Sequence, residues 1–231
     1  MIKAIIGMFM IVMLAITGCT GGQTINVSGD SEILVDPDQA EVWAGISIVK
    51  LSAEEAQSEA NKVINDIIDG LRYKGISEDD IATERLSLYE ERRYENGKST
   101  VVGWRATQTL KITTEDLDKV GTIVDVAVNN GANQIQNINF GLSDEKEQEV
   151  KKEAIAKATT NAKDKAEAIA DSLDVRLGKV KTVSEADHYY RPYMYAMEAK
   201  AAGDAVIQEA AAIMPDKVSV TGQISLVYSV R

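Results

Sequence analysis

Three residue types are scarce in this sequence of 231 residues, which contains one cysteine, one histidine and three prolines. One cysteine excludes a disulfide bond within the chain. One histidine excludes most of the metal and triad chemistry that needs two or more imidazoles. The sequence also lacks a G-x-S-x-G turn, a Gly-rich phosphate loop and an H-E-x-x-H pair. We therefore expect a protein that is not an enzyme and that holds no cofactor.

Basic residues are outnumbered. The chain has 25 lysines and arginines against 36 acidic residues, which gives a formal net charge of −11 at pH 7. Nucleic-acid phosphates demand a basic face, so nucleic acid is not an expected partner. Hydrophobic residues make up 45% of the chain, and with few prolines this composition is typical of a globular protein that buries a core.

The N-terminal residues have the layout of a secretory signal. Residues 1–18 combine Lys3, an apolar run over 4–16 and small residues before Cys19. The apolar run is shorter than the roughly 20 residues that a membrane-spanning helix needs. Residues 16–19, Ile-Thr-Gly-Cys, resemble the lipobox of lipoprotein precursors, which implies cleavage before Cys19 and lipid on its sulfur.

This layout predicts a signal peptide over 1–18, a lipidated cysteine with a tether over 19–23 and a domain over 24–231. Two acyl chains, at about 0.8 kcal/mol per buried methylene, would hold the protein at a membrane outside the cytoplasm, in the periplasm or at the cell surface. Two alternatives stay open. One is an ordinary cleaved signal with a coincidental cysteine, and the other is an uncleaved N-terminal anchor.

The apolar pattern predicts an α+β fold. Strands are expected at 24–29, 40–51, 134–142, 176–187 and 217–230, and the runs that flank Asn96-Gly97, within 83–114, predict a hairpin. Helices are expected from Ser52 to Tyr73, over 115–130 and over 144–173. The order β-β-α-β-β-α-β-α-β-β predicts mostly antiparallel sheet, in one or more sheets, with three helices packed on one face.

Three finer expectations accompany this fold. Residues 90–93, Glu-Glu-Arg-Arg, are expected to form a charged outer face of the hairpin with cross-strand pairing. Asn26-Val27-Ser28 matches the acceptor pattern for N-glycosylation, which matters only in an organism that glycosylates exported proteins. The buried stripe of the last helix is expected to consist of Val150, Ala154, Ala158, Ala162, Ala166, Ile169 and Leu173.

The segment 188–215 is the longest break between predicted elements, and its first ten residues crowd together tyrosine and methionine. Three interpretations stay open. A mobile surface loop is one, and soft-metal capture of Cu(I) by His188, Met194 and Met197 is another. The third is an interaction loop, because Tyr, Met and Arg are enriched in interface cores. Its residues would be Tyr189, Tyr190, Arg191, Tyr193, Met194, Tyr195 and Met197.

Several stretches resemble the SIMPL-domain family of exported proteins. They are "INVSGDSEILVDPDQAEV", "NGKSTVVGWRATQTLKI", "AIAKATTNAKDKAEAIADSL" and the Pro/Met/Tyr loop before the last strand, and together the match covers 24–231. The family includes a periplasmic immunogenic protein, an envelope protein linked to oxidative-stress defence and at least one member that resembles a channel-like ring. It has no established catalytic residues to transfer. Several relatives look like free periplasmic proteins, so the lipobox is a departure.

The sequence therefore predicts a lipid-anchored cell-envelope protein that acts by oligomeric assembly or binding, without catalysis, with a link to envelope or oxidative-stress defence implied by the resemblance. The expected partners are the membrane, through lipid on Cys19, and further copies of the chain. The alternative is a stress protein that binds a soft metal or a small ligand through residues 188–197.

Overall fold

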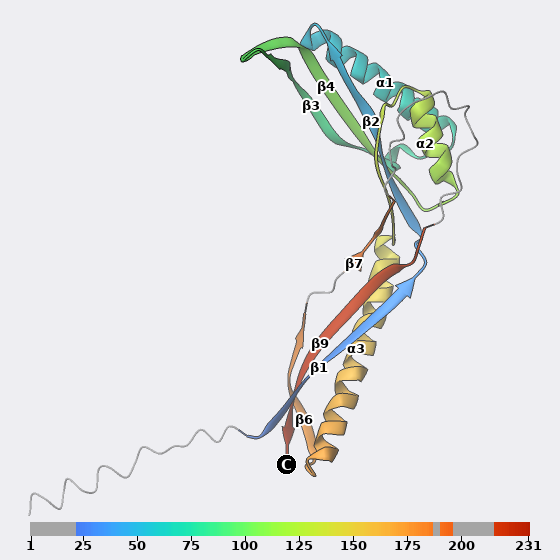
Figure 1. The fold of residues 1–231 in the computed structure, drawn as a ribbon. Coiled ribbons are helices and arrows are strands. Elements are labelled where there is room, and N and C mark those ends of the chain that lie inside the picture. Colours follow the sequence, from blue (N-terminus) through green and yellow to red (C-terminus); the bar gives the residue numbers. More distant parts are fainter. Residues whose placement is uncertain (1–21, 187–189, 196–214) are drawn as a thin grey trace, which may run out of the picture. The chain divides into compact units, whose positions relative to one another are not determined.

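The computed structural model describes residues 22–186, 190–195 and 215–231. The chain divides into two compact units. The first unit comprises the residues up to Asp30 together with Lys157–Ala186 and Gln223–Arg231, and the second unit comprises Ser31–Ala156 and Asp187–Gly222. Figure 1 shows the elements of both units, coloured along the sequence.

The elements follow the predicted order, and the predicted α+β class is confirmed. They are β1 (Thr24–Val35), β2 (Gln39–Lys50), α1 (Ala53–Tyr73), the short 3₁₀ helix η1 (Glu78–Asp80), β3 (Ile81–Glu95), β4 (Lys98–Thr114), α2 (Lys119–Asn129), β5 (Gln134–Gly141), α3 (Asp144–Ser172), β6 (Leu177–Glu185), β7 (Tyr190–Arg191), β8 (Tyr193–Tyr195) and β9 (Val218–Val230). The short strands β7 and β8 are additions, and they lie inside the segment predicted as a long loop. The boundaries between the units fall within β1, α3 and β9.

Helix α2 is shorter than predicted. It begins at Lys119 and not at residue 115, because Thr114 closes a turn ahead of it. The Thr114 hydroxyl accepts a hydrogen bond from the Asp116 N–H at 3.1 Å and donates one to the Asp116 carbonyl at 3.2 Å. This local bonding gives the backbone an alternative to a helical turn.

The other two helices begin where the sequence predicts. The Ser52 hydroxyl accepts a hydrogen bond from the Glu55 N–H at 3.2 Å, and the Ser143 hydroxyl accepts one from the Lys146 N–H at 3.4 Å. Each bond satisfies one of the four N–H groups that a helix leaves unpaired at its start. Within the described ranges, no helix combines the length and the apolar character needed to cross a membrane.

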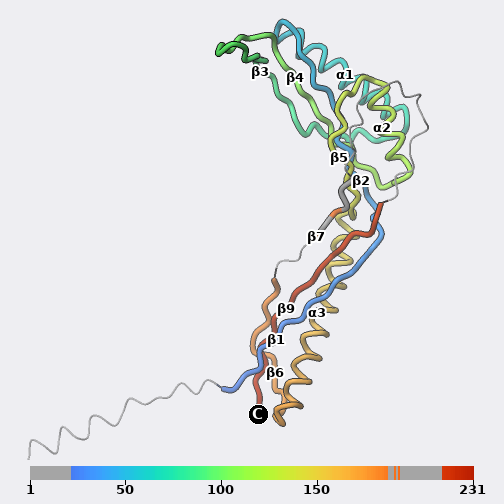
Figure 2. The backbone as a smooth tube through the Cα atoms, viewed as in Figure 1, coloured from blue at the N-terminus to red at the C-terminus, as the bar shows by residue number. Residues whose placement is uncertain are grey.

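A five-stranded antiparallel sheet, in the order β3-β4-β2-β5-β8, forms the larger part of the second unit. Helices α1 and α2 pack on one face of it, which Figures 1 and 2 show. The Asn96-Gly97 turn between β3 and β4 has φ values of 51° and 75°, as the predicted type I′ hairpin requires. The core between helices and sheet includes the fully buried Val42, Ile67, Leu71, Leu110, Ile112, Ile123, Ile138 and Phe140.

A smaller apolar cluster lies elsewhere in the second unit. Its buried residues are Leu142, Val150, Ala154, Val218 and Val220, and Ile33, Val35 and Tyr190 pack against them. The cluster joins the first turns of α3 to the end of β1, the start of β9 and β7. Through Tyr190, the tyrosine-rich segment contacts this cluster.

The first unit contains the start of β1, the end of β9 and the whole of β6, which pair in that order, together with α3 from Lys157 onward. Val230 N–H donates to the Gln23 carbonyl and the Ser225 hydroxyl lies 3.3 Å from Asn26 Oδ1, so β1 and β9 run antiparallel. Alanines spaced by four residues form the buried stripe of α3 here: Ala158, Ala162, Ala166 and Ala170.

Two residues of the predicted α3 stripe were assigned wrongly. Ile169 is 40% exposed and Leu173 is 63% exposed, whereas Ala170 is buried. The stripe continues in steps of four residues, and only methyl side chains fit between α3 and the sheet, because the backbone of Gly29 in β1 comes close to the helix backbone. Larger side chains therefore lie to the side of the contact.

Candidate functional site

The tyrosine-rich segment is partly built into the sheets of the second unit. β7 pairs with β9, with Tyr190 opposite Val220, and β8 pairs with β5, with Tyr193 opposite Phe140. Pro192 stands between the two short strands and has no N–H group to donate to either neighbour. The backbone of residues 190–195 therefore pairs with one strand of each sheet.

The other predicted site residues are placed only in part. Cys19, His188, Tyr189 and Met197 lie outside the described residues. The backbone pairs Arg191 with Ser219, Met194 with Asn139 and Tyr195 with Ile138. The soft-metal set of His188, Met194 and Met197 stays a prediction, and so does the interaction loop. Asn26 is exposed on β1, and its glycosylation also stays a prediction.

Tyr190 has a well-defined side-chain environment. Its hydroxyl oxygen accepts a hydrogen bond from the Leu142 N–H at 2.8 Å, and its ring packs against the smaller apolar cluster. Burial raises the pKa of the Tyr190 phenol above 10.0, although the bond from Leu142 acts in the opposite direction. The phenol is therefore neutral across the physiological pH range and serves as an acceptor.

Replacing Tyr190 by phenylalanine is expected to lower the free energy of unfolding by about 1–2 kcal/mol, because the Leu142 N–H loses its partner while it stays shielded from water. In the parent chain the folded state holds the Tyr190 proton more tightly than the unfolded state, so this group's contribution to stability is lost as the pH rises above 10. Urea unfolding at pH 7 and pH 10.5 checks both effects. Tyr73→Phe is the control, since Tyr73 is 87% exposed, and equal losses in the two variants would contradict the assignment.

A polar groove lies beside Tyr190 on the second unit. Two adjoining cavities of about 190 and 420 Å³ share Gln39, Glu41 and Asp144 in their walls. Lys111 Nζ and Glu41 Oε1 form an ion pair at 3.0 Å in this wall. The side-chain oxygen of Asn139 is buried there and has no hydrogen-bond partner within the described part of the chain. The groove therefore offers mainly acceptors, which suits a ligand that brings hydrogen-bond donors.

The β3–β4 hairpin carries the densest group of exposed apolar side chains among the described residues. Its members, which we call the hairpin surface, are Leu86, Leu88, Tyr94, Val101 and Val102. Leu86 is 63% exposed and Tyr94 is 75% exposed. α1 packs mainly on β2 and β4 and leaves the helix-side face of β3 largely uncovered. Clustered apolar exposure of this kind marks interaction surfaces.

The opposite face of the same hairpin is polar. Arg105 Nε donates to Glu91 Oε2 at 2.7 Å across the strands, and Arg105 also donates to the Ser47 hydroxyl at 3.2 Å. The Arg105 hydrogen bond lowers the pKa of the Glu91 carboxyl, which therefore stays ionised at neutral pH. The charged outer face expected over 90–93 is present only in part: Glu91 forms a cross-strand pair here, whereas Glu90 alternates onto the other face, where it pairs along the strand with Arg92 at 2.7 Å.

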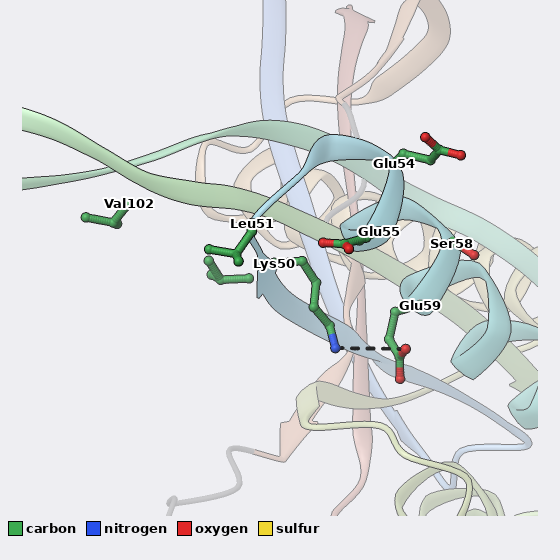
Figure 3. Close-up of a pocket in the computed structure, with 8 residues that line it drawn as sticks. Lys50, Leu51, Glu54, Glu55, Ser58, Glu59 and Val102 are labelled. Atoms are coloured by element: carbon green, nitrogen blue, oxygen red, sulfur yellow. Dashed lines mark ion pairs between the residues drawn. The ribbon is translucent and has the colours of Figure 1, made fainter.

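A second groove, of about 650 Å³, lies where β2 ends and α1 begins (Figure 3). Val49, Leu51 and Val102 form an apolar side, and the first two turns of α1 contribute the glutamates and Ser58. Lys50 Nζ and Glu59 Oε2 approach to 3.9 Å across it, as the dashed line in Figure 3 shows. Because Val102 belongs to the hairpin surface, this groove extends that surface toward α1.

Among the described residues, no group of three or more His, Cys, Asp or Glu side chains is placed to hold a metal ion. The sequence reasoning predicted the hairpin itself but not its exposed apolar side. Leu86 and Leu88 alternate as core residues of a strand do, and only the position of α1 leaves them uncovered. The one signal of this exposure in the sequence was length, because a strand of 15 residues such as β3 is longer than a helix of 21 residues such as α1 and cannot be covered by it completely.

The described residues form two antiparallel sheets and three α-helices, which define a two-unit α+β protein. Comparison with known families places it further. The chain belongs to the SIMPL family, described as a protein of unknown function (DUF541), whose model matches residues 25–228.

Individual relatives agree with this assignment. The chain is 27% identical over 208 residues to the uncharacterized protein YggE of Escherichia coli K12, covering 88% of this chain and 84% of the relative. It is 28% identical over 166 residues to the 26 kDa periplasmic immunogenic protein of Brucella melitensis, covering 70% and 66%. An interleukin-1 receptor-associated kinase 1-binding protein 1 homolog of Xenopus laevis is 24% identical over 172 residues, covering 74% and 66%.

Proposed function

We propose that this protein is an exported lipoprotein of the cell envelope that acts by binding or self-assembly and not by catalysis. The signal-like residues 1–18, followed directly by Cys19, support export and lipidation. A family member named as periplasmic supports the same compartment. The link to envelope or oxidative-stress defence is part of this proposal and rests on the family resemblance.

The hairpin surface is the observation that supports the mode of action. Single exposed apolar residues are normal, but a cluster of them on one hairpin has an unfavourable free energy of contact with water. A partner that covers the cluster removes this cost. Lipid on Cys19 would confine all copies to one plane of the membrane. Weak contacts between copies then suffice for assembly, because anchoring raises their effective concentration.

The mass of residues 20–231 in solution tests this function. We expect light scattering after gel filtration to give a defined oligomer whose share grows with protein concentration. A Tyr94→Ser/Val101→Ser variant is expected to reduce the oligomer at least about fivefold, which is about 1 kcal/mol of association free energy. Leu34→Ser is the matched control, because Leu34 is 59% exposed outside the hairpin surface.

A strictly monomeric chain that also retains no partner in a membrane pull-down would contradict the proposal. If the Tyr94→Ser/Val101→Ser variant forms the same share of oligomer as the parent chain, the protein self-assembles but not through these residues of the hairpin surface.

A further inference from the structure

Strand β3 is an edge strand with an unusually long free side. It has 15 residues, it pairs only with β4 in the described structure, and 12 of its side chains are exposed while none is buried. An edge strand presents unpaired N–H and C=O groups that can pair with another chain. Natural edges are usually protected by proline, by a covering element or by charges that repel a second strand. β3 contains no proline, and its charges are not arranged to repel a second copy of the strand.

The charges of β3 are complementary to themselves in one antiparallel register. The β3–β4 ladder is regular from Arg85 to Glu91, with register shifts on both sides of this stretch. Leu88 is the centre of the stretch. If two copies pair antiparallel with Leu88 opposite Leu88, Arg85 of each copy lies opposite Glu91 of the other.

Both faces of such a pair are favourable. Directly opposed residues of antiparallel strands share a face, and diagonal neighbours are within reach. Leu88 therefore meets Leu88 of the other copy, and Leu86 of each copy lies diagonal to it and opposite Glu90, which brings together four leucine side chains that are exposed in the single chain. On the opposite face, Tyr89 of the two copies become diagonal neighbours between the two Arg85–Glu91 pairs.

Glu91 is prepared for a second ion pair. Arg105 binds its Oε2 atom and keeps the carboxylate ionised. No bond to Oε1 is recorded within the described residues, and a carboxylate accepts several donors. Arg85 is exposed, and within the same residues its guanidinium group forms no hydrogen bond or ion pair.

The neighbouring registers are worse. Pairing centred on Ser87 places Arg85 opposite Tyr89 and so loses both Arg85–Glu91 pairs, and pairing centred on Tyr89 places Arg85 opposite Arg93. Like charges directly opposite each other destabilise a sheet. Parallel pairing in register would oppose every charge to its own kind. The sequence of β3 thus favours one arrangement of two copies.

We propose that two copies of this chain pair antiparallel along β3, with Leu88 of each copy at the twofold axis. This inference rests on the proposed function, because it names the surface through which the chain self-assembles. The pairing joins two five-stranded sheets into one continuous sheet, with α1 and α2 of both copies on the same face. The contact is isologous and therefore closes at two copies.

A cysteine at position 88 tests the register directly. In a Cys19→Ser/Leu88→Cys chain, the two introduced thiols lie on directly opposed residues, whose Cα atoms in antiparallel strands are about 4.5–5.5 Å apart. That separation fits a disulfide. In the control, Cys19→Ser/Leu86→Cys, each cysteine lies opposite Glu90 of the other copy. The two thiols are then four residues, about 13 Å, apart along the strands, which is too far for a disulfide.

After mild oxidation we expect the Leu88→Cys chain to form a disulfide-linked dimer at least about tenfold faster than the Leu86→Cys chain, although Leu86 is the more exposed residue. Adding Arg85→Glu should slow the Leu88→Cys cross-link at least about fivefold, because it places a second carboxylate opposite Glu91 of the other copy. Adding Arg93→Glu makes the same charge change outside the regular stretch and should leave the rate unchanged.

Equal cross-linking at positions 86 and 88, or equal effects of the two charge reversals, would overturn the proposed register. If light scattering shows that the parent chain is an oligomer but the Leu88→Cys chain forms no disulfide-linked dimer, β3 pairing is overturned and the proposed function stays in place. A monomer without a cross-link would overturn both.

Discussion

Replacing Cys19 by serine is expected to move the protein out of the membrane fraction. A diacylglyceryl group provides two acyl chains, and each buried methylene contributes about 0.8 kcal/mol to membrane binding. Without the sulfur, neither chain can be attached, and none of the described helices provides a substitute span. We expect the membrane-bound share to fall at least about tenfold, measured by fractionation and immunoblotting.

Thr20→Ala is the matched control, because it changes the adjacent residue and keeps the thiol. The intact mass of the mature N-terminus completes the experiment, since lipid on Cys19 adds a defined mass. A Cys19→Ser chain that stays in the membrane, together with a parent chain whose intact mass shows the uncleaved leader and no lipid, would indicate an uncleaved N-terminal anchor. A parent chain that is already free of the membrane would indicate an ordinary cleaved signal. Either result would remove the lipoprotein part of the proposed function.

Replacing Gly29 by alanine is expected to destabilise the first unit by about 3 kcal/mol or more. A Cβ atom at this position would overlap the Ala158 carbonyl oxygen and would lie 2.5 Å from the Ala162 backbone nitrogen. Backbone atoms of a helix cannot move aside individually, so α3 would have to shift as a whole. Overpacking of a close contact costs about 1–3 kcal/mol, and contacts with backbone lie at the upper end.

Gly22→Ala is the control for this substitution. The nearest atom to its new methyl group would be the Lys181 Nζ at 3.3 Å, the end of a flexible side chain. We expect its effect to stay within about 0.5 kcal/mol. Urea unfolding followed by circular dichroism measures both variants. Similar midpoints for Gly29→Ala and the parent chain would show that α3 does not pack against β1 as closely as described.

Much of the fold could be predicted from the sequence because it depends on local signals. Asn96-Gly97 fixes the β3–β4 turn through two positive φ values, and Ser52 and Ser143 fix the helix starts through hydrogen bonds to nearby N–H groups. The start of α2 was missed because the Thr114 turn competes with helix at the same place in the chain.

The candidate site was harder to predict because exposure is a property of the whole fold. Leu86 and Leu88 have the alternation of core residues, and they are exposed because α1 covers the neighbouring strands instead. The strands β7 and β8 were likewise hidden, since their pairing partners, Val220 and Phe140, lie 30 and 53 positions away in the sequence. The hydrogen bond from Leu142 to Tyr190 has the same long-range origin.

The alanine stripe of α3 has a consequence for how the protein opens. A buried methyl group removes far less apolar surface from water than a leucine or phenylalanine side chain, so the helix of the first unit is held with little free energy per residue. The core beneath α1 and α2 contains isoleucine, leucine and phenylalanine instead. We therefore expect amide protons of α3 in the first unit to exchange with solvent through local opening well before those of β2 and β4, as native-state hydrogen exchange would measure.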